Sequence, residues 1–147
     1  MTKARTLADF DTTSAGKVLQ LIKVDMNSEV IAASSSFVSA ISASITPSST
    51  SSKILVMPSI QFNVPASADA STFQIKRGSS VIQEHQDQGA GGGFLKNTYS
   101  PVYLDSPNSS SATQYEVVFN RTGGTGNVSV STSNTSNSSI TLMEIAA

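Results

Sequence analysis

The segment FVSAISASIT, residues 37–46, alternates apolar and polar side chains along its length. Odd-numbered positions place Phe37, Ile41 and Ile45 on one face. Even-numbered positions from Ser42 onward present hydroxyl groups on the other face. A period of two is typical of an antiparallel strand with one side in the core. The segment therefore predicts a half-buried strand, and with it a sheet protein.

Further strands are predicted on both sides of this segment. KVLQLIKVD, residues 17–25, precedes it, and KILVMPSIQFNV, residues 53–64, follows it as the most apolar stretch of the chain and the expected central strand. Pro58 cannot donate a ladder hydrogen bond, so it is expected at a bulge, a bend or a change of sheet. The other predicted strands cover residues 71–77, 80–84, 102–104, 113–121, 127–132 and 140–146.

The spacing of the strands predicts the fold class. Polar turns separate the strands at intervals of roughly 8–12 residues, as in sandwiches and jelly rolls. No stretch follows the 3.6-residue period of a long helix. The predicted fold is all-β: an antiparallel β-sandwich or jelly roll over residues 17–147, with residues 1–16 as a short N-terminal arm. Pro47 and the Ser/Thr run after it predict a hydrogen-bonded turn that returns residues 53–64 beside residues 37–46.

The predicted core takes large apolar side chains from the alternating positions, with one member of its last, adjacent pair expected to face outward. Its members are Phe37, Ile41, Ile45, Leu55, Phe62, Phe73, Val118 and Phe119.

Composition and charge exclude several classes of protein. The chain has 147 residues, the size of one domain, and charged residues make up 13%, about half the usual share. Net charge is −1 and the basic residues are scattered, so no nucleic-acid partner is expected. No apolar run approaches the ~20 residues that cross a bilayer, so no membrane insertion is expected. The absence of cysteine excludes disulfides and thiolate metal sites.

One histidine, His85, lies between Glu84 and Asp87. A histidine with nearby carboxylates could bind a metal, but the spacing matches no zinc or calcium loop. The favoured interpretation is a solvated loop residue after a strand. The other interpretation is that three copies of His85 meet around the axis of a trimer.

No enzyme is predicted, and no catalytic residue, cofactor or metal site is assigned. No serine stands in a Gly-x-Ser-x-Gly elbow. Paired acids for glycoside hydrolysis would have to come from Glu84, Asp87, Asp105 and Glu116. A polysaccharide depolymerase is therefore the least favoured function, because the chain has one histidine, few acids and no tryptophan.

Two segments are candidates for contact with other molecules. The glycine run containing Gly89, Gly91, Gly92 and Gly93 lacks the Lys-Ser/Thr of a phosphate loop. It predicts either a flexible connection or an adaptable binding loop, where bare backbone can approach a ligand.

The N-terminal arm carries Leu7 and Phe10 at i, i+3 spacing, as on one side of a helical turn. Such a turn is too short to be stable alone in water. It is expected to dock on the domain, on a neighbouring copy or on a larger assembly. The arm is expected to be dispensable for folding and needed for attachment.

Four segments resemble short fibre-type and virion-surface proteins of tailed bacteriophages, especially those of marine and cyanobacterial hosts. They are KARTLADF (3–10), GKVLQ (16–20), ITPSSTSSKILV (45–56) and SITLMEI (139–145). The resemblance implies a virion component with a β-sandwich domain, usually a homotrimer, and brings no catalytic residues with it. This chain is shorter than long fibres and lacks shaft repeats, which leaves tail and head locations open.

The favoured function is a non-enzymatic tail-fibre or receptor-binding module on the outer surface of the virion. It would contact a host surface glycan or protein, and other virion proteins through the arm. The alternative is a capsid decoration (cement) protein docked on the head. A homotrimer is also favoured by the low charge, with the Ser/Thr/Ala faces of residues 39–44 and 128–133 expected to pack between copies.

Overall fold

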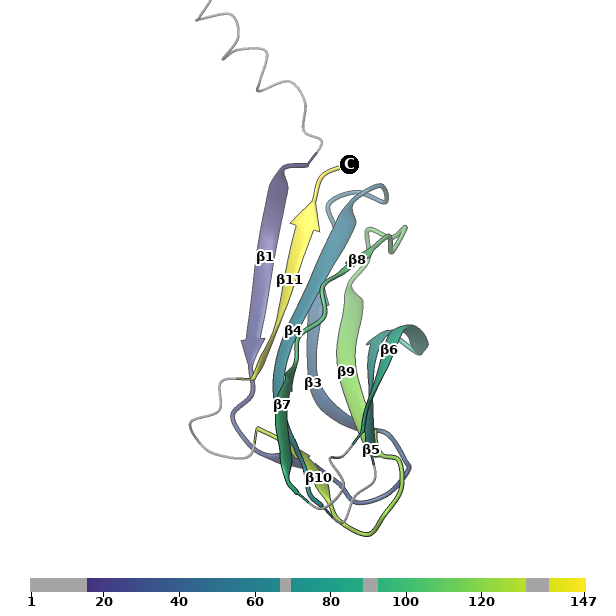
Figure 1. Cartoon of the computed structure of the whole chain (residues 1–147). Helices are drawn as coiled ribbons and strands as arrows, with labels where there is room; N and C mark the ends of the chain where they lie inside the picture. Colours follow the sequence, from purple (N-terminus) through teal and green to yellow (C-terminus); the bar gives the residue numbers. More distant parts are fainter. Residues whose placement is uncertain (1–15, 67–69, 89–92, 132–137) are drawn as a thin grey trace, which may run out of the picture.

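The computed structural model describes residues 16–66, 70–88, 93–131 and 138–147, except for the side chains of residues 87 and 88. These residues form two antiparallel sheets packed as a sandwich, with no helix in the described ranges (Figure 1). The larger sheet contains β1 (Val18–Asp25), β2 (Val30–Ala32), β4 (Lys53–Val64), β7 (Leu95–Tyr99), β8 (Tyr103–Asp105), β10 (Val128–Val130) and β11 (Ser139–Ile145). The smaller sheet has the order β3 (Val38–Ile45), β9 (Thr113–Arg121), β5 (Ala70–Arg77) and β6 (Ser80–Gln88). The predicted all-β sandwich is confirmed.

The long strand β4 organises the larger sheet, as its apolar sequence predicts. Its first half pairs with β11 and β8, and its second half pairs with β10 and β7. Pro58 lies where β8 pairing has ended at Val56 and β7 pairing has not yet begun at Ile60. Because proline lacks the N–H that a ladder needs, this change of partner suits it. β4 stays in one sheet, and Pro58 pairs with Ile140 in an unshifted register, so the expected change of sheet and bulge are not found.

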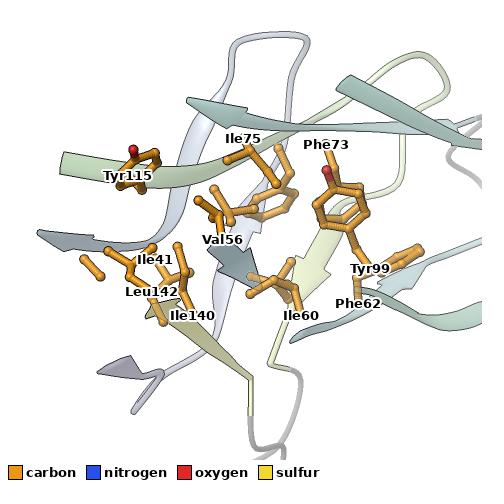
Figure 2. Close-up of a cluster of buried hydrophobic side chains, with 14 of the residues drawn as sticks. Ile41, Val56, Ile60, Phe62, Phe73, Ile75, Tyr99, Tyr115, Ile140 and Leu142 are labelled. Atoms are coloured by element: carbon orange, nitrogen blue, oxygen red, sulfur yellow. The ribbon is translucent and has the colours of Figure 1, made fainter. Parts of the chain in front are cut away.

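The core fills the space between the sheets (Figure 2). Every even-numbered side chain of β4 from Ile54 to Val64 is buried, which matches the period of two. Phe73 of β5 meets Phe62, Tyr99 and Phe119, with ring centroids 4.8, 4.9 and 5.7 Å apart. This aromatic cluster joins strands of both sheets, so it ties one layer to the other.

Two predicted core residues are wrong. Phe37 is 41% exposed, and Leu55 is only half-buried on the outer side of β4. A β-bulge between Ser39 and Ile41 changes the phase of β3, so Val38 contacts the core before the bulge and Ile41 after it. Phe37 fits the alternation in the sequence but lies on the wrong side of the bulge.

In the last predicted pair, Phe119 belongs to the core, whereas Val118 is buried but lies outside the core cluster and alternates with it, so one member faces away from the core as expected. The other predicted members, Ile41, Ile45, Phe62 and Phe73, are buried as expected.

The expected pairing of residues 37–46 with residues 53–64 is wrong. β3 pairs with β9 in one sheet, whereas β4 pairs with β11 in the other. The turn is hydrogen-bonded as predicted, with the Ser52 N–H donating to the Ser49 carbonyl at 3.2 Å. It carries the chain across the sandwich and does not close a hairpin.

Strands β2 and β7 were not predicted from the sequence. In addition, residues 128–131, part of a face expected to pack between copies, are buried within the chain. Residues 132–133 lie outside the described ranges.

Candidate binding groove between the sheet edges

Two strands that do not pair with each other lie at the same side of the sandwich. β6 is one of the two edge strands of the smaller sheet, and β7 lies at an edge of the larger sheet, paired with β4. Each strand has one partner in the described structure, so neither closes the gap between the layers. A groove of about 250 Å³ remains between them.

The groove is lined almost entirely by side chains that can form hydrogen bonds. β6 contributes Gln83, Glu84 and His85, and β7 contributes Asn97, Thr98 and Tyr99, followed by Ser100 and Pro101. Amide, hydroxyl and carboxylate groups beside ring surfaces are the chemistry that recognises a polar, uncharged ligand.

Several groups of the groove have a fixed geometry. The Gln74 amide donates to Glu84 Oε2 at 2.6 Å, which holds the carboxylate from the neighbouring strand. The rings of His85 and Tyr99 are stacked, with centroids 6.0 Å apart and planes at 18°. Gln83 Oε1 is enclosed, and no donor among the described residues reaches it. An enclosed acceptor without a donor lowers stability.

The structure changes the interpretation of His85. The residue lies within β6, opposite Phe73, and not in a loop after a strand. Its side chain is exposed and contributes to the groove. Within the described part of the chain, no group of three or more His, Cys, Asp or Glu could hold a metal ion.

The acidic residues considered for glycoside hydrolysis lie in different parts of the structure. Glu84 lies in the groove, whereas Asp105 is buried and paired with Arg77, whose Nη1 is 2.8 Å from Asp105 Oδ2. Glu116 lies in β9, beside Lys76 and Ser42. Asp87 lies in β6, and its side chain is outside the described part.

Most of the predicted contact segments lie outside the described residues. This holds for Gly89, Gly91 and Gly92 and for Leu7 and Phe10 of the arm. Gly93 is described, and a side chain added there would meet open space.

The β7 residues of the groove were missed from the sequence. The strand-favouring residues Thr98 and Tyr99, between the glycine run and Pro101, are the signal that could have revealed them.

A second polar cluster is buried at the end of the sandwich where β1 begins and β11 ends. The Glu144 carboxylate is fully buried and accepts hydrogen bonds from the Gln20 amide at 2.6 Å and from the Ser48 N–H and hydroxyl at 2.7 Å each. Gln20, Ser48 and Glu144 come from three segments that are far apart in the sequence, residues 16–20, 45–56 and 139–145. Those segments therefore form one structural unit, in which a buried glutamate anchors the crossing turn.

Burial acts to raise the pKa of Glu144, but the hydrogen bonds from Ser48, Gln20 and Ser52 outweigh it and lower the pKa from 4.5 to about 2. A depressed carboxyl pKa contributes stability above the unfolded-state value, and this stability is lost as pH falls from about 4.5 toward 2. The turn over Glu144 is open to water, so we expect a loss on the order of 2 to 3 kcal/mol.

The test is chemical denaturation of the parent and of Glu144→Gln as a function of pH. Glu144→Gln should be less stable at pH 7, because an amide N–H₂ faces the Ser48 donors, and should lose less stability on acidification. Glu29→Gln controls for the removal of one negative charge. Parallel pH profiles for the parent and Glu144→Gln would contradict the expectation.

Comparison with known proteins gives a likeness of fold only. No family model matches the chain, and no curated protein matches it. Among solved structures, the infectious bursal disease virus VP2 subviral particle is similar with a TM-score of 0.47, 10% identity and coverage of 84% of this chain. The structure of the same virus's Gt strain gives 0.46, 8% and 90%. The chain spans about a third of those solved chains, 32% and 38% of their lengths. Likenesses this distant carry no functional inference.

In the described residues, no helix has the length and apolar character needed to cross a membrane.

Proposed function

We propose that this chain is a non-enzymatic structural component on the outer surface of a phage virion, a tail-fibre type module that contacts the host surface. The observation that carries the proposal is the convergence of three phage-like segments on Glu144. Segments far apart in the chain share one buried cluster, so their likeness to phage proteins concerns a whole structural unit and not isolated short motifs.

In the proposal, attachment to the virion and contact with the host take place near opposite ends of β4. The Gly16 N–H donates to the Ala146 carbonyl at 2.7 Å, so the segment leading to the N-terminal arm leaves beside the end of β11. The groove adjoins the other half of β4, where Tyr99 pairs with Ile60 (Figure 1). In the proposal, the arm with Leu7 and Phe10 attaches a homotrimer to other virion proteins, and the groove contacts the host.

The groove favours a glycan over a protein as the host ligand. Its volume of about 250 Å³ lies below the range of drug-sized pockets and suits one small polyol unit. Its polar groups lie beside the exposed His85 side chain, whose ring stacks on the buried Tyr99, and sugar rings present hydroxyl groups beside C–H surfaces.

A glycan array probed with the purified chain tests the ligand class. We expect binding to a restricted set of neutral glycans, and about a tenfold loss of affinity for Asn97→Ala or Glu84→Gln, the effect of one lost hydrogen bond. Glu29→Gln, the same chemical change in an exposed loop, should bind as the parent does. Absence of glycan binding, or equal loss with Glu29→Gln, would contradict the glycan assignment.

Quantitative mass spectrometry of purified particles tests the location. A tail-fibre module is expected at the low copy number of a tail appendage. A copy number that matches the capsid lattice would replace this proposal with the capsid decoration alternative. Absence of the chain from particles would overturn both.

A further inference from the structure

A row of aliphatic side chains crosses the outer face of the larger sheet. Leu21 of β1 is in register with Met143 of β11, Met143 with Leu55 of β4, and Leu55 with Leu104 of β8. Directly opposed residues of antiparallel strands lie on the same face. The inward neighbours confirm the orientation, because Ile22 packs against the core and Asp105 is buried. All four side chains of the row therefore point away from the core.

The row is part of a larger apolar surface. Ile145 and Met57 lie two positions along β11 and β4 and share the same face. We call these six residues the outer apolar face: Leu21, Leu55, Met57, Leu104, Met143 and Ile145. With strands about 4.8 Å apart, the face covers roughly 300 Å² in plan. Leu21 is 54% and Leu104 56% exposed.

Such a surface requires an explanation. Contiguous apolar patches of about this size are among the largest on a monomeric protein, and they commonly mark interaction sites. Of the two Ser/Thr/Ala faces first expected to pack between copies, residues 128–131 are buried within the chain, and residues 39–44 present exposed or half-buried serines but no apolar patch. We propose that the outer apolar face is the surface through which copies of this chain associate.

The charges around the face favour a second copy as the occupant. Lys23 and Asp25 follow Leu21 on the same side of β1 and form an ion pair at 2.6 Å. Lys53, opposite Ile145, donates to Ser106 Oγ at 2.7 Å. One cation and one anion at the rim can complement the same pair on another copy, whereas an unbalanced charge would repel itself. The chain's net charge of −1 adds little long-range repulsion between copies.

The inference rests on the proposed function only for the expected number of associated chains, which is three. The face is smaller than the about 800 Å² per partner of a standard interface. We therefore expect association that depends on concentration, with contributions from side chains around the rim.

Sedimentation of the full chain from low micromolar to submillimolar concentration tests the proposal. We expect a mass that rises from 15.3 kDa to that of a trimer. Leu21→Lys and Leu104→Lys should each keep the chain at the monomer mass, with the circular dichroism and melting temperature of the parent. Phe94→Lys changes a side chain that is 72% exposed but lies outside the face, and it should associate as the parent does.

The outcomes separate the occupants. A parent that stays monomeric throughout, or face variants that associate normally, would overturn the proposal. Loss of association in the double variant Leu7→Ser, Phe10→Ser would make the N-terminal arm the occupant and also overturn it. A dimer that the face variants dissociate would support the surface and contradict only the trimer of the proposed function.

Discussion

Replacing Phe73 with alanine is expected to lower the free energy of unfolding by about 3 to 5 kcal/mol, the usual cost of emptying a buried phenylalanine site. Phe73 is fully buried, and its ring meets three others, two from the opposite sheet and one from its neighbour β9. The surrounding strands hold these rings in place, so the cavity cannot collapse completely. Urea unfolding at constant pH measures the loss.

Phe37→Ala is the matched control, because it makes the same chemical change at a side chain that is 41% exposed. We expect a loss of less than about 1 kcal/mol, typical of surface substitutions. Equal losses at Phe73 and Phe37 would mean that the bulge in β3 and the position of the aromatic cluster are wrong.

Asp105→Asn is expected to cost about 1.5 to 3 kcal/mol, because it weakens the hydrogen bonds to a buried carboxylate, whereas the partner Arg77 is about a third exposed and keeps part of its hydration. Asp105 lies in β8 of the larger sheet and accepts from Arg77 Nη1 at 2.9 and 2.8 Å and from the Tyr115 hydroxyl at 2.6 Å. Arg77 and Tyr115 belong to the smaller sheet. Burial, and then the hydrogen bond and charge of Asp105, raise the pKa of Tyr115, so its hydroxyl stays a donor. The network therefore fastens the two sheets together.

Asp25→Asn provides the comparison for this substitution. Asp25 pairs with Lys23, but the two side chains are 54% and 52% exposed, so its loss should cost about 0 to 1 kcal/mol. A double-mutant cycle with Arg77→Ala and Asp105→Ala should give a coupling well above that value. A cost at Asp105 no larger than at Asp25 would mean that the sheets are held by the core alone.

The alternation of apolar and polar residues in the sequence correctly predicted those strands in which every second side chain is buried. β4 is the clearest case, since its even-numbered residues form much of the core. The same rule failed at Phe37, because a bulge moves the pattern by one residue without changing the residue types around it. It also failed for β2, whose three residues are too few to show a period.

Pairing and the groove depend on contacts that the local sequence does not encode. A Ser/Thr-rich turn suits both a hairpin and a crossing between sheets, and Glu144, far along the chain, holds the crossing form. The groove combines β6 and β7, which are consecutive but belong to different sheets. From the sequence, His85 and Glu84 could be noted as candidates, but not their proximity to Asn97.

The position of β11 between β1 and β4 has a consequence for how the chain is made. β1 is synthesised early, yet its partner in the described structure is β11, the latest of the strands. Until β11 leaves the ribosome, β1 has no ladder and one side of the apolar β4 is open. Only β5 and β6 are both consecutive and paired among the described strands, so most of the ladders join segments that are distant in the chain. Folds dominated by distant pairing form slowly and expose strand edges meanwhile. A nascent chain stalled before residue 139 would therefore offer those edges to its neighbours on the same polysome.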